Sequence, residues 1–266
     1  MHSTPNMPNS APVNPHDFIP DDRSQVYRSV GDILTHVAER SGVTVDPTTH
    51  TRWREAMGLM REFDTFADEQ CATPQQALSA LGSFSLFATR YPALTQEALG
   101  QPVRNQMMGH VRTILELGQL IAVETDVTRF LELRKVEAYH TVQILGAAAT
   151  GYVKRQPNFS LCMWHLTGFG IGANLADSVI DARYDYACGK ARLQPSASFY
   201  SLAAAGIMRH SGPHMHTALD QKGVAIRIHM IAERVANRLK HGITPYSNLR
   251  LVAGLWRRHP RGSGPT

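Results

Sequence analysis

The chain has 266 residues, of which 43% are hydrophobic, so it is long enough for a large folded domain with a substantial core. Lys and Arg number 27 against 22 Asp and Glu, which gives a net charge of +5. This excess is mild, and a nucleic-acid-binding protein would more often show a dense basic stripe, so we expect no nucleic-acid partner. Three scattered cysteines form no disulfide framework, and no stretch approaches the roughly 18 apolar residues of a membrane span. We therefore expect a cytoplasmic protein with no membrane span.

Apolar residues at helical spacing predict helices along nearly all of the chain after a Pro-, Ser- and Asn-rich tail at 1–22, which we expect to be flexible. Prolines open the second and third helices, another proline interrupts the fourth, and Asp126 caps the fifth. The predicted helices cover residues 30–42, 47–70, 74–91, 94–124, 127–153, 160–187, 216–242 and 246–259. The pattern predicts one all-α domain of roughly eight to ten helices over residues 23–259, followed by a short C-terminal tail at 260–266.

Acidic residues gather at the end of the second predicted helix, in the sequence REFDTFADEQ. Asp64 and Asp68 are four residues apart and therefore share a helical face, with Glu69 beside them. Phe63 and Phe66 surround these acids with apolar surface. Surface helices often carry such acids, so this cluster alone is a weak sign of a binding site.

A second polar stripe runs along the helix predicted at 160–187. Asn174, Asp177, Ser178, Asp181 and Asp185 follow helical spacing and fall on one face. Asn, Ser and Asp are poor residues for a helix interior, and the stacked carboxylates repel one another, so the stripe indicates a polar demand from outside the helix. Mg²⁺ creates such a demand, because it prefers oxygen ligands and often binds one or two carboxylates together with substrate phosphates.

Four segments resemble the motifs of class I terpene synthases, in the order that this family has. DTFADE at 64–69 resembles the first aspartate-rich motif, and NLADSVIDA at 174–182 resembles the second, Asn-Asp-x-x-Ser-x-x-x-Glu. The helix RFLELRKVEAYHTVQILGA places Arg134 at the position of the diphosphate-sensing arginine. NLRLVAGLWRR places Arg257 at the Arg of the terminal Arg-Tyr pair. The resemblance covers about residues 50 to 259.

This resemblance implies an isoprenoid synthase fold and a Mg²⁺-dependent lyase that ionises and cyclises a linear prenyl diphosphate and releases diphosphate. Mn²⁺ is an alternative ion, and a homodimer is left open. The residues that would hold metal are Asp64, Asp68, Glu69, Asn174, Asp177, Ser178 and Asp181. The cations that would hold the diphosphate are Arg134, Arg183, Lys190 and Arg257. The side chains that would line a dry cavity for the carbocation are Phe63, Phe66, Tyr139, Trp164, Phe169 and Trp256.

The sequence also departs from the family pattern, which leaves other functions open. Thr65 replaces the second Asp of the first motif, Arg258 stands at the usual Tyr, and Ala182 replaces the Glu that ends the second motif. In another register, DSVIDAR and GKARLQP resemble elements of squalene and phytoene synthases, which join two prenyl diphosphates head to head. The remaining alternatives are a metal-independent cyclase that reuses the fold and a helical binding protein without enzymatic activity.

Overall fold

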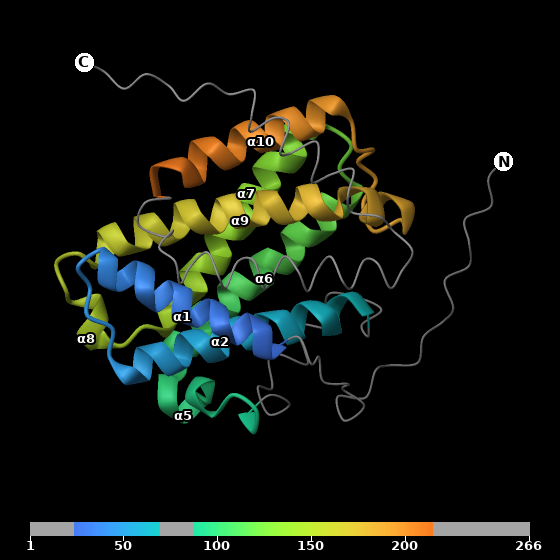
Figure 1. Ribbon diagram of the computed structural model, residues 1–266. Coiled ribbons are helices and arrows are strands. Elements are labelled where there is room, and N and C mark those ends of the chain that lie inside the picture. Colours follow the sequence, from blue (N-terminus) through green and yellow to red (C-terminus); the bar gives the residue numbers. More distant parts are fainter. Residues whose placement is uncertain (1–23, 70–87, 215–266) are drawn as a thin grey trace, which may run out of the picture.

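The computed structural model describes residues 24–69 and 88–214, and every regular element in these two ranges is a helix (Figure 1). The predicted all-α class is therefore confirmed for this part of the chain. Both predicted tails, the helices predicted at 216–242 and 246–259 and most of the one predicted at 74–91 lie outside it. The helices are α1 (Ser24–Arg40), α2 (Pro47–Glu69), η2 (Pro92–Leu94), α5 (Gln96–Leu99), α6 (Gln101–Val123), α7 (Val127–Ala148), α8 (Gly151–Lys154), α9 (Phe159–Ala187), α10 (Ala197–Ser211) and η3 (Gly212–His214).

Helix α9 has the central place in the bundle. It runs between α10 on one side and α1 on the other, and α6 and α7 cross the bundle behind it (Figure 1). Two apolar cores result. The first joins α1 and α2 to the first half of α9, and the second joins α7 and α10 to its second half. Helices α2 and α9 both end on the same side of the molecule (Figure 1).

The start of α2 explains why α7 ends where it does. Asp46 caps α2 by accepting a hydrogen bond from the Thr49 backbone N–H at 2.9 Å. The Thr150 hydroxyl also donates to Asp46, with an oxygen–oxygen distance of 2.5 Å, and Thr150 itself caps α8. The single helix predicted at 127–153 is therefore wrong. It divides at Ala149 and Thr150, because a residue about one hundred positions earlier binds Thr150 there.

One further helix boundary differs from the prediction, and one helix was not predicted. Gly100 has a φ angle of 72°, which favours glycine, and it separates α5 from α6, so the proline at 102 begins α6 instead of interrupting a longer helix. Helix α10 was not predicted. Its cap is Ser196, whose hydroxyl accepts from the Phe199 N–H at 3.1 Å. The helix predicted at 160–187 and the Asp126 cap of α7 are confirmed.

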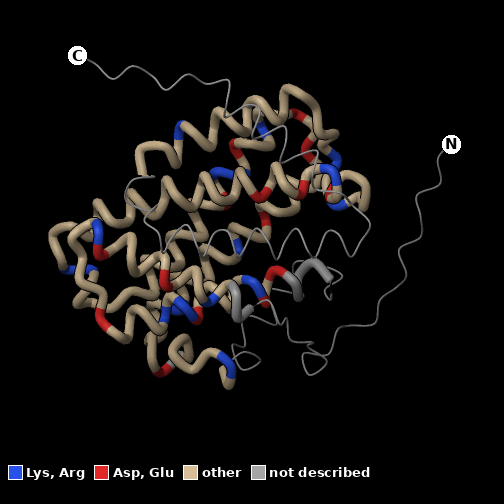
Figure 2. The backbone as a smooth tube through the Cα atoms, viewed as in Figure 1, with Lys and Arg blue, Asp and Glu red and all other residues tan. Residues whose placement is uncertain are grey.

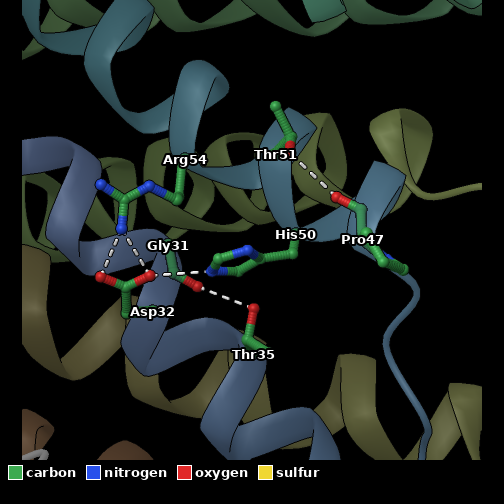
Figure 3. A network of polar contacts seen from close by, with 7 residues as sticks. All are labelled: Gly31, Asp32, Thr35, Pro47, His50, Thr51 and Arg54. Atoms are coloured by element: carbon green, nitrogen blue, oxygen red, sulfur yellow. Dashed lines mark hydrogen bonds and ion pairs between the residues drawn. The ribbon is translucent and has the colours of Figure 1, made fainter.

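Polar contacts hold α1 against α2 where the two helices approach most closely (Figure 3). A β-carbon on Gly31 would lie 2.7 Å from the Arg54 backbone, so only glycine allows this approach. Beside it, Asp32 accepts from both partners on α2, with Arg54 Nη1 at 2.6 Å and His50 Nε2 at 2.8 Å (Figure 3).

The loop between α1 and α2 is tied to the segment before α9 by one side-chain amide. Gln156 accepts from the Thr44 backbone N–H and donates to the Thr44 carbonyl oxygen, each at 2.7 Å. This pair of bonds is the arrangement that a neighbouring strand would make with an extended residue. It fixes the turn before α2 relative to α8 and α9.

The first half of α9 carries glycines where α10 and η3 pack against it. A β-carbon on Gly168 would lie 2.1 Å from the His214 ring, and one on Gly172 would lie 2.5 Å from the Ser211 side chain. His165 and His214, both buried, approach each other with their Nδ1 atoms 2.9 Å apart. Close packing between helices is therefore the structural role of these glycines.

Candidate functional site

Arg134 lies near the middle of the contact between α7 and α9. Its side chain is only 21% exposed and forms an ion pair with Glu137, one turn later on α7, at 2.8 Å. From α9, Asn174 donates to the Arg134 carbonyl oxygen and to the Glu137 carboxylate, both at 2.9 Å. The predicted arginine and the predicted amide are therefore brought together, with Glu137 between them.

Carboxylates from two other helices surround Arg134. Burial alone would lower the pKa of Arg134, but the charges of Glu137, Asp185 and Asp64 outweigh it and raise the pKa above its usual value. Asp64 is on α2, in the first predicted motif, and Asp185 is on α9, one turn after the second predicted motif, so acids from two other helices act on one guanidinium. Figure 2 shows the charged residues of α9 confined to its second half.

The polar groups at this site retain hydrogen-bonding capacity. Arg134 Nε is buried and has no hydrogen-bond partner within the described ranges. Asn174 uses its Nδ2 twice as a donor, while its Oδ1 accepts no hydrogen bond from the residues that the structure describes. The Nε atoms of Arg28 and Arg52 are also buried without a hydrogen-bond partner in the described ranges, so this feature is shared by three arginines. Buried polar atoms are usually hydrogen-bonded, so the Arg134 N–H is available to a further acceptor.

A small pocket lies beside Arg134. It has a volume of about 10 Å³, which is close to the lower limit for one water molecule. Helices α7, α9 and α10 and the segment between the last two form its wall, which consists of Phe130, Arg134, Ser178, Ala182, Asp185, Ala191, Leu193, Pro195 and Phe199. A space of this size fits one ion or water, not a hydrocarbon chain.

The other predicted polar residues are distributed around this centre. Ser178 is buried on the same face of α9 and donates to the Asn174 carbonyl oxygen at 2.9 Å. Asp64 is exposed and pairs with Arg61 at 3.0 Å. Asp177 and Asp181 are half-buried on α9.

The predicted cations other than Arg134 are less buried. Arg183 and Lys190 are exposed, and Arg257 lies outside the described residues. In residues 24–69 and 88–214, no three His, Cys, Asp or Glu side chains are grouped so that they could hold a metal ion by themselves. Any ion there would therefore need ligands from other groups, such as amides, hydroxyls, water or phosphate.

The predicted cavity-lining residues fall into three groups. Phe63 and Phe169 are 7% exposed and belong to the first core. Tyr139 and Trp164 are 46% and 55% exposed, and the Trp164 ring packs edge-on against His214. The side chains of Phe66, Asp68 and Glu69, and all of Trp256, lie outside the part of the chain that the structure describes.

Two acids at this site were not among the predicted ligands, Glu137 and Asp185. Asp185 continues the stripe of Asn174 and Ser178 at helical spacing, so its place could have been found from the sequence. Glu137 gave no such signal, because its role depends on which face of α7 meets α9. Glu137 is therefore identified only once the two helices are packed.

No protein-family model, curated protein or solved structure matches the chain. None of the described helices has both the length and the apolar character needed to cross a membrane.

Proposed function

We propose that this protein ionises and cyclises a linear prenyl diphosphate with the help of Mg²⁺ and releases diphosphate, as class I terpene synthases do. The observation that carries this proposal is the meeting of three helices at Arg134. Asp64 from the first motif-like segment and Asp185 from the helix of the second both contribute to the raised pKa of this one half-buried cation. A diphosphate-binding site needs this combination, since a cation and metal-binding acids must lie within reach of one leaving group.

The residues at this site suit magnesium. Carboxylate, amide and hydroxyl oxygens are the ligands that Mg²⁺ prefers, and Asp64, Asn174 and Ser178 offer one of each. Glu137, Asp185 and Asp64 together raise the pKa of Arg134, so three carboxylates act on one guanidinium. When bound, Mg²⁺ would supply Lewis acidity that neutralises the diphosphate.

Arg134 has two tasks in this proposal. Its guanidinium binds a diphosphate oxygen through the N–H that lacks a partner within the described ranges, and it stabilises the charge that grows as the carbon–oxygen bond breaks. Glu137 and Asn174 hold Arg134 in place, because they tie its side chain and its carbonyl oxygen to α9. This support fixes the guanidinium before the ligand arrives, which reduces the entropy lost on binding.

Asp64→Asn tests the proposal directly. Purified protein is incubated with Mg²⁺ and prenyl diphosphates of 10, 15 or 20 carbons, and the hydrocarbon products and released diphosphate are measured. Loss of turnover in Asp64→Asn, with turnover retained in Glu97→Gln, supports the assignment. Glu97 is an exposed acid on α5, so it controls for the loss of one surface charge. Full activity of Asp64→Asn would contradict the metal site.

A second candidate function is head-to-head joining of two prenyl diphosphates. The observation in its favour is the segment Gly189–Pro195, which carries the sequence GKARLQP and contributes Ala191, Leu193 and Pro195 to the pocket at Arg134. Product analysis separates the two functions. A cyclase converts a single substrate to a product with the same number of carbons, whereas head-to-head joining doubles the carbon number.

A further inference from the structure

Two histidines meet where α6 packs against α7. His110 is on α6 and His140 is on α7, and their Nδ1 atoms are 3.0 Å apart. We propose that these two rings form a binding site for one transition-metal ion, such as Zn²⁺, with water completing its coordination. The inference goes beyond the proposed function and does not depend on it, because helical spacing places His140 on a different face of α7 from Arg134.

The connection between the two helices explains why these rings meet. Helices α6 and α7 form an antiparallel hairpin, because only residues 124–126 separate them. His110 and His140 are equally far from Thr125, the middle residue of this connection, so the hairpin brings them to the same height. Each histidine also lies well inside its helix, where backbone hydrogen bonds fix its position. The pair is therefore positioned by two long helices, as a binding site requires.

The two rings have each other as their polar partners. The ring planes are tilted by 47° with centroids 5.2 Å apart, and the Tyr139 ring packs edge-on against His140. Among the residues that the structure describes, neither histidine has a second hydrogen-bond partner, whereas His50 is held by the carboxylate of Asp32. A contact between two Nδ1 atoms is one hydrogen bond, which uses the lone pair of only one ring. A metal ion would use the lone pairs of both.

The surroundings of His110 favour the form that binds metal, which is the neutral ring. Burial lowers the pKa of His110, and the charge of the neighbouring His140 lowers it further. Both rings are only half-buried, so an ion with its water molecules can reach them from solvent. Imidazole suits Zn²⁺, Cu²⁺ and Ni²⁺, whereas Mg²⁺ prefers oxygen ligands, so this pair should discriminate against Mg²⁺.

The separation of the two nitrogens suits a shared ion. Bonds from Zn²⁺ to imidazole nitrogen are about 2.0–2.1 Å long, so nitrogens 3.0 Å apart would subtend an angle of about 95° at the ion. A separation larger by about 0.3 Å would give the tetrahedral angle that Zn²⁺ prefers. Each ring would turn so that its lone pair points at the ion, and the χ2 torsion of histidine permits this turn. Two protein ligands leave the other positions to water, since the described ranges hold no group of three metal-binding side chains.

The first experiment titrates the full-length protein with Zn²⁺ and measures binding by calorimetry. The variants are His110→Asn, His140→Asn and the double variant. Asparagine keeps a hydrogen-bonding group close to the position of Nδ1 but is a poor ligand for Zn²⁺. We expect each single variant to weaken the same binding event by about 10²-fold or more, because one ligand of a pair is lost. The double variant should lose no more than either single variant, because both act on one site.

His210→Asn is the matched control for the loss of one half-buried histidine. His210 is on α10, and the charges of Lys135 and Arg209 act on it, so a cation is disfavoured there. This control should keep the binding event. Zn²⁺ should also raise the melting temperature of the wild type and of the control, but not that of His110→Asn or His140→Asn.

Nitrogen-15 NMR of the wild-type histidines identifies the ligand atoms without any substitution. Saturation with Zn²⁺ should place two rings in the form that is bound through Nδ1 and protonated at Nε2. Mg²⁺ at the same concentration should leave these signals unchanged. This measurement decides the question if the variants fail to fold.

The outcomes either support or overturn the two-histidine site. Loss of one Zn²⁺-binding event in both single variants, with two wild-type rings bound through Nδ1, supports it. Binding that survives in either single variant, rings bound only through Nε2, or a wild type that binds no Zn²⁺ would overturn it. None of these measurements uses a prenyl diphosphate, so a negative result leaves the proposed function unaffected.

Discussion

The contact between α1 and α2 and the contact between α7 and α9 both depend on buried or half-buried polar groups, but they use these groups differently. Between α1 and α2, Asp32 accepts from both Arg54 and His50, and burial, which would raise the pKa of Asp32, is outweighed by these two partners. Between α7 and α9, Arg134 and Asn174 keep unused hydrogen-bonding atoms within the described residues. The Asp32 network is satisfied by its own members, whereas the α7–α9 contact leaves polar atoms that can take a further partner.

Replacing Arg134 is expected to have the largest effect, and it would show whether the α7–α9 contact serves binding. Arg134→Gln removes the cation, so we expect the turnover number to fall by about 10²- to 10³-fold. Stability should change far less than activity, since Asn174 still binds the backbone carbonyl at position 134. Assays with prenyl diphosphates, together with urea unfolding, measure the two effects. A variant with a lower free energy of unfolding but an unchanged turnover number would show that the role of Arg134 is structural.

Adding one methyl group to α9 should have the next largest effect. In Gly168→Ala, the new β-carbon meets the His214 ring and lies 2.7 Å from the His210 carbonyl oxygen, which cannot move without shifting α10. We expect a loss of about 1–3 kcal/mol in the free energy of unfolding. Gly118→Ala is the matched control, because its β-carbon meets nothing within 4 Å. That control should gain about 0.5–1 kcal/mol from helix propensity, and an equal gain in Gly168→Ala would contradict the close packing.

The Asp46 cap should give the smallest of the three effects, and one that depends on pH. Burial would raise the pKa of Asp46, but hydrogen bonds from Thr150 and Thr49 outweigh it and lower the pKa below 3.8. The carboxylate therefore stabilises the folded state fully above pH 3.8, and this contribution is lost as the pH falls through the lower, folded-state pKa. Asp46→Ala should cost about 0.5–2 kcal/mol at pH 7.

Urea unfolding of the wild type and Asp46→Ala across this pH range measures the cap. The difference between the two proteins should shrink below pH 3.8. Asp46→Asn is the control, because an asparagine can still accept the hydrogen bond from the Thr49 N–H but does not titrate. A difference that stays constant down to the lowest pH would mean that the Asp46 charge contributes nothing.

Local signals in the sequence account for most of the described helices. Proline opens α2, Asp126 caps α7, and apolar spacing places α9 nearly to the residue. The division between α7 and α8 could not be predicted, because it depends on Thr150 meeting Asp46 from a distant part of the chain. Helix α10 did have a local signal in its Ser196 cap, but its apolar pattern did not predict a helix.

The candidate site was predictable only as far as single helices allow. Arg134, Asn174 and Ser178 were predicted from the resemblance to class I terpene synthases, and all three lie where α7 and α9 meet. Glu137 could not be predicted, because its role depends on the contact with Asn174 of α9, and the sequence does not show which helix packs against this face of α7. Which carboxylate faces Arg134 is a property of the packed bundle, and it distinguishes Asp185 from Asp177 and Asp181.

The bonds between Gln156 and Thr44 make one amide proton an indicator of the contact between the α1–α2 loop and the segment before α9. Thr44 lies in an exposed loop, yet both of its backbone polar groups are held by a side chain 112 residues away. Its amide can therefore exchange with deuterium only when this contact opens. The exchange rate at Thr44 would report how often the segment before α9 separates from the loop before α2, long before the helices themselves unfold.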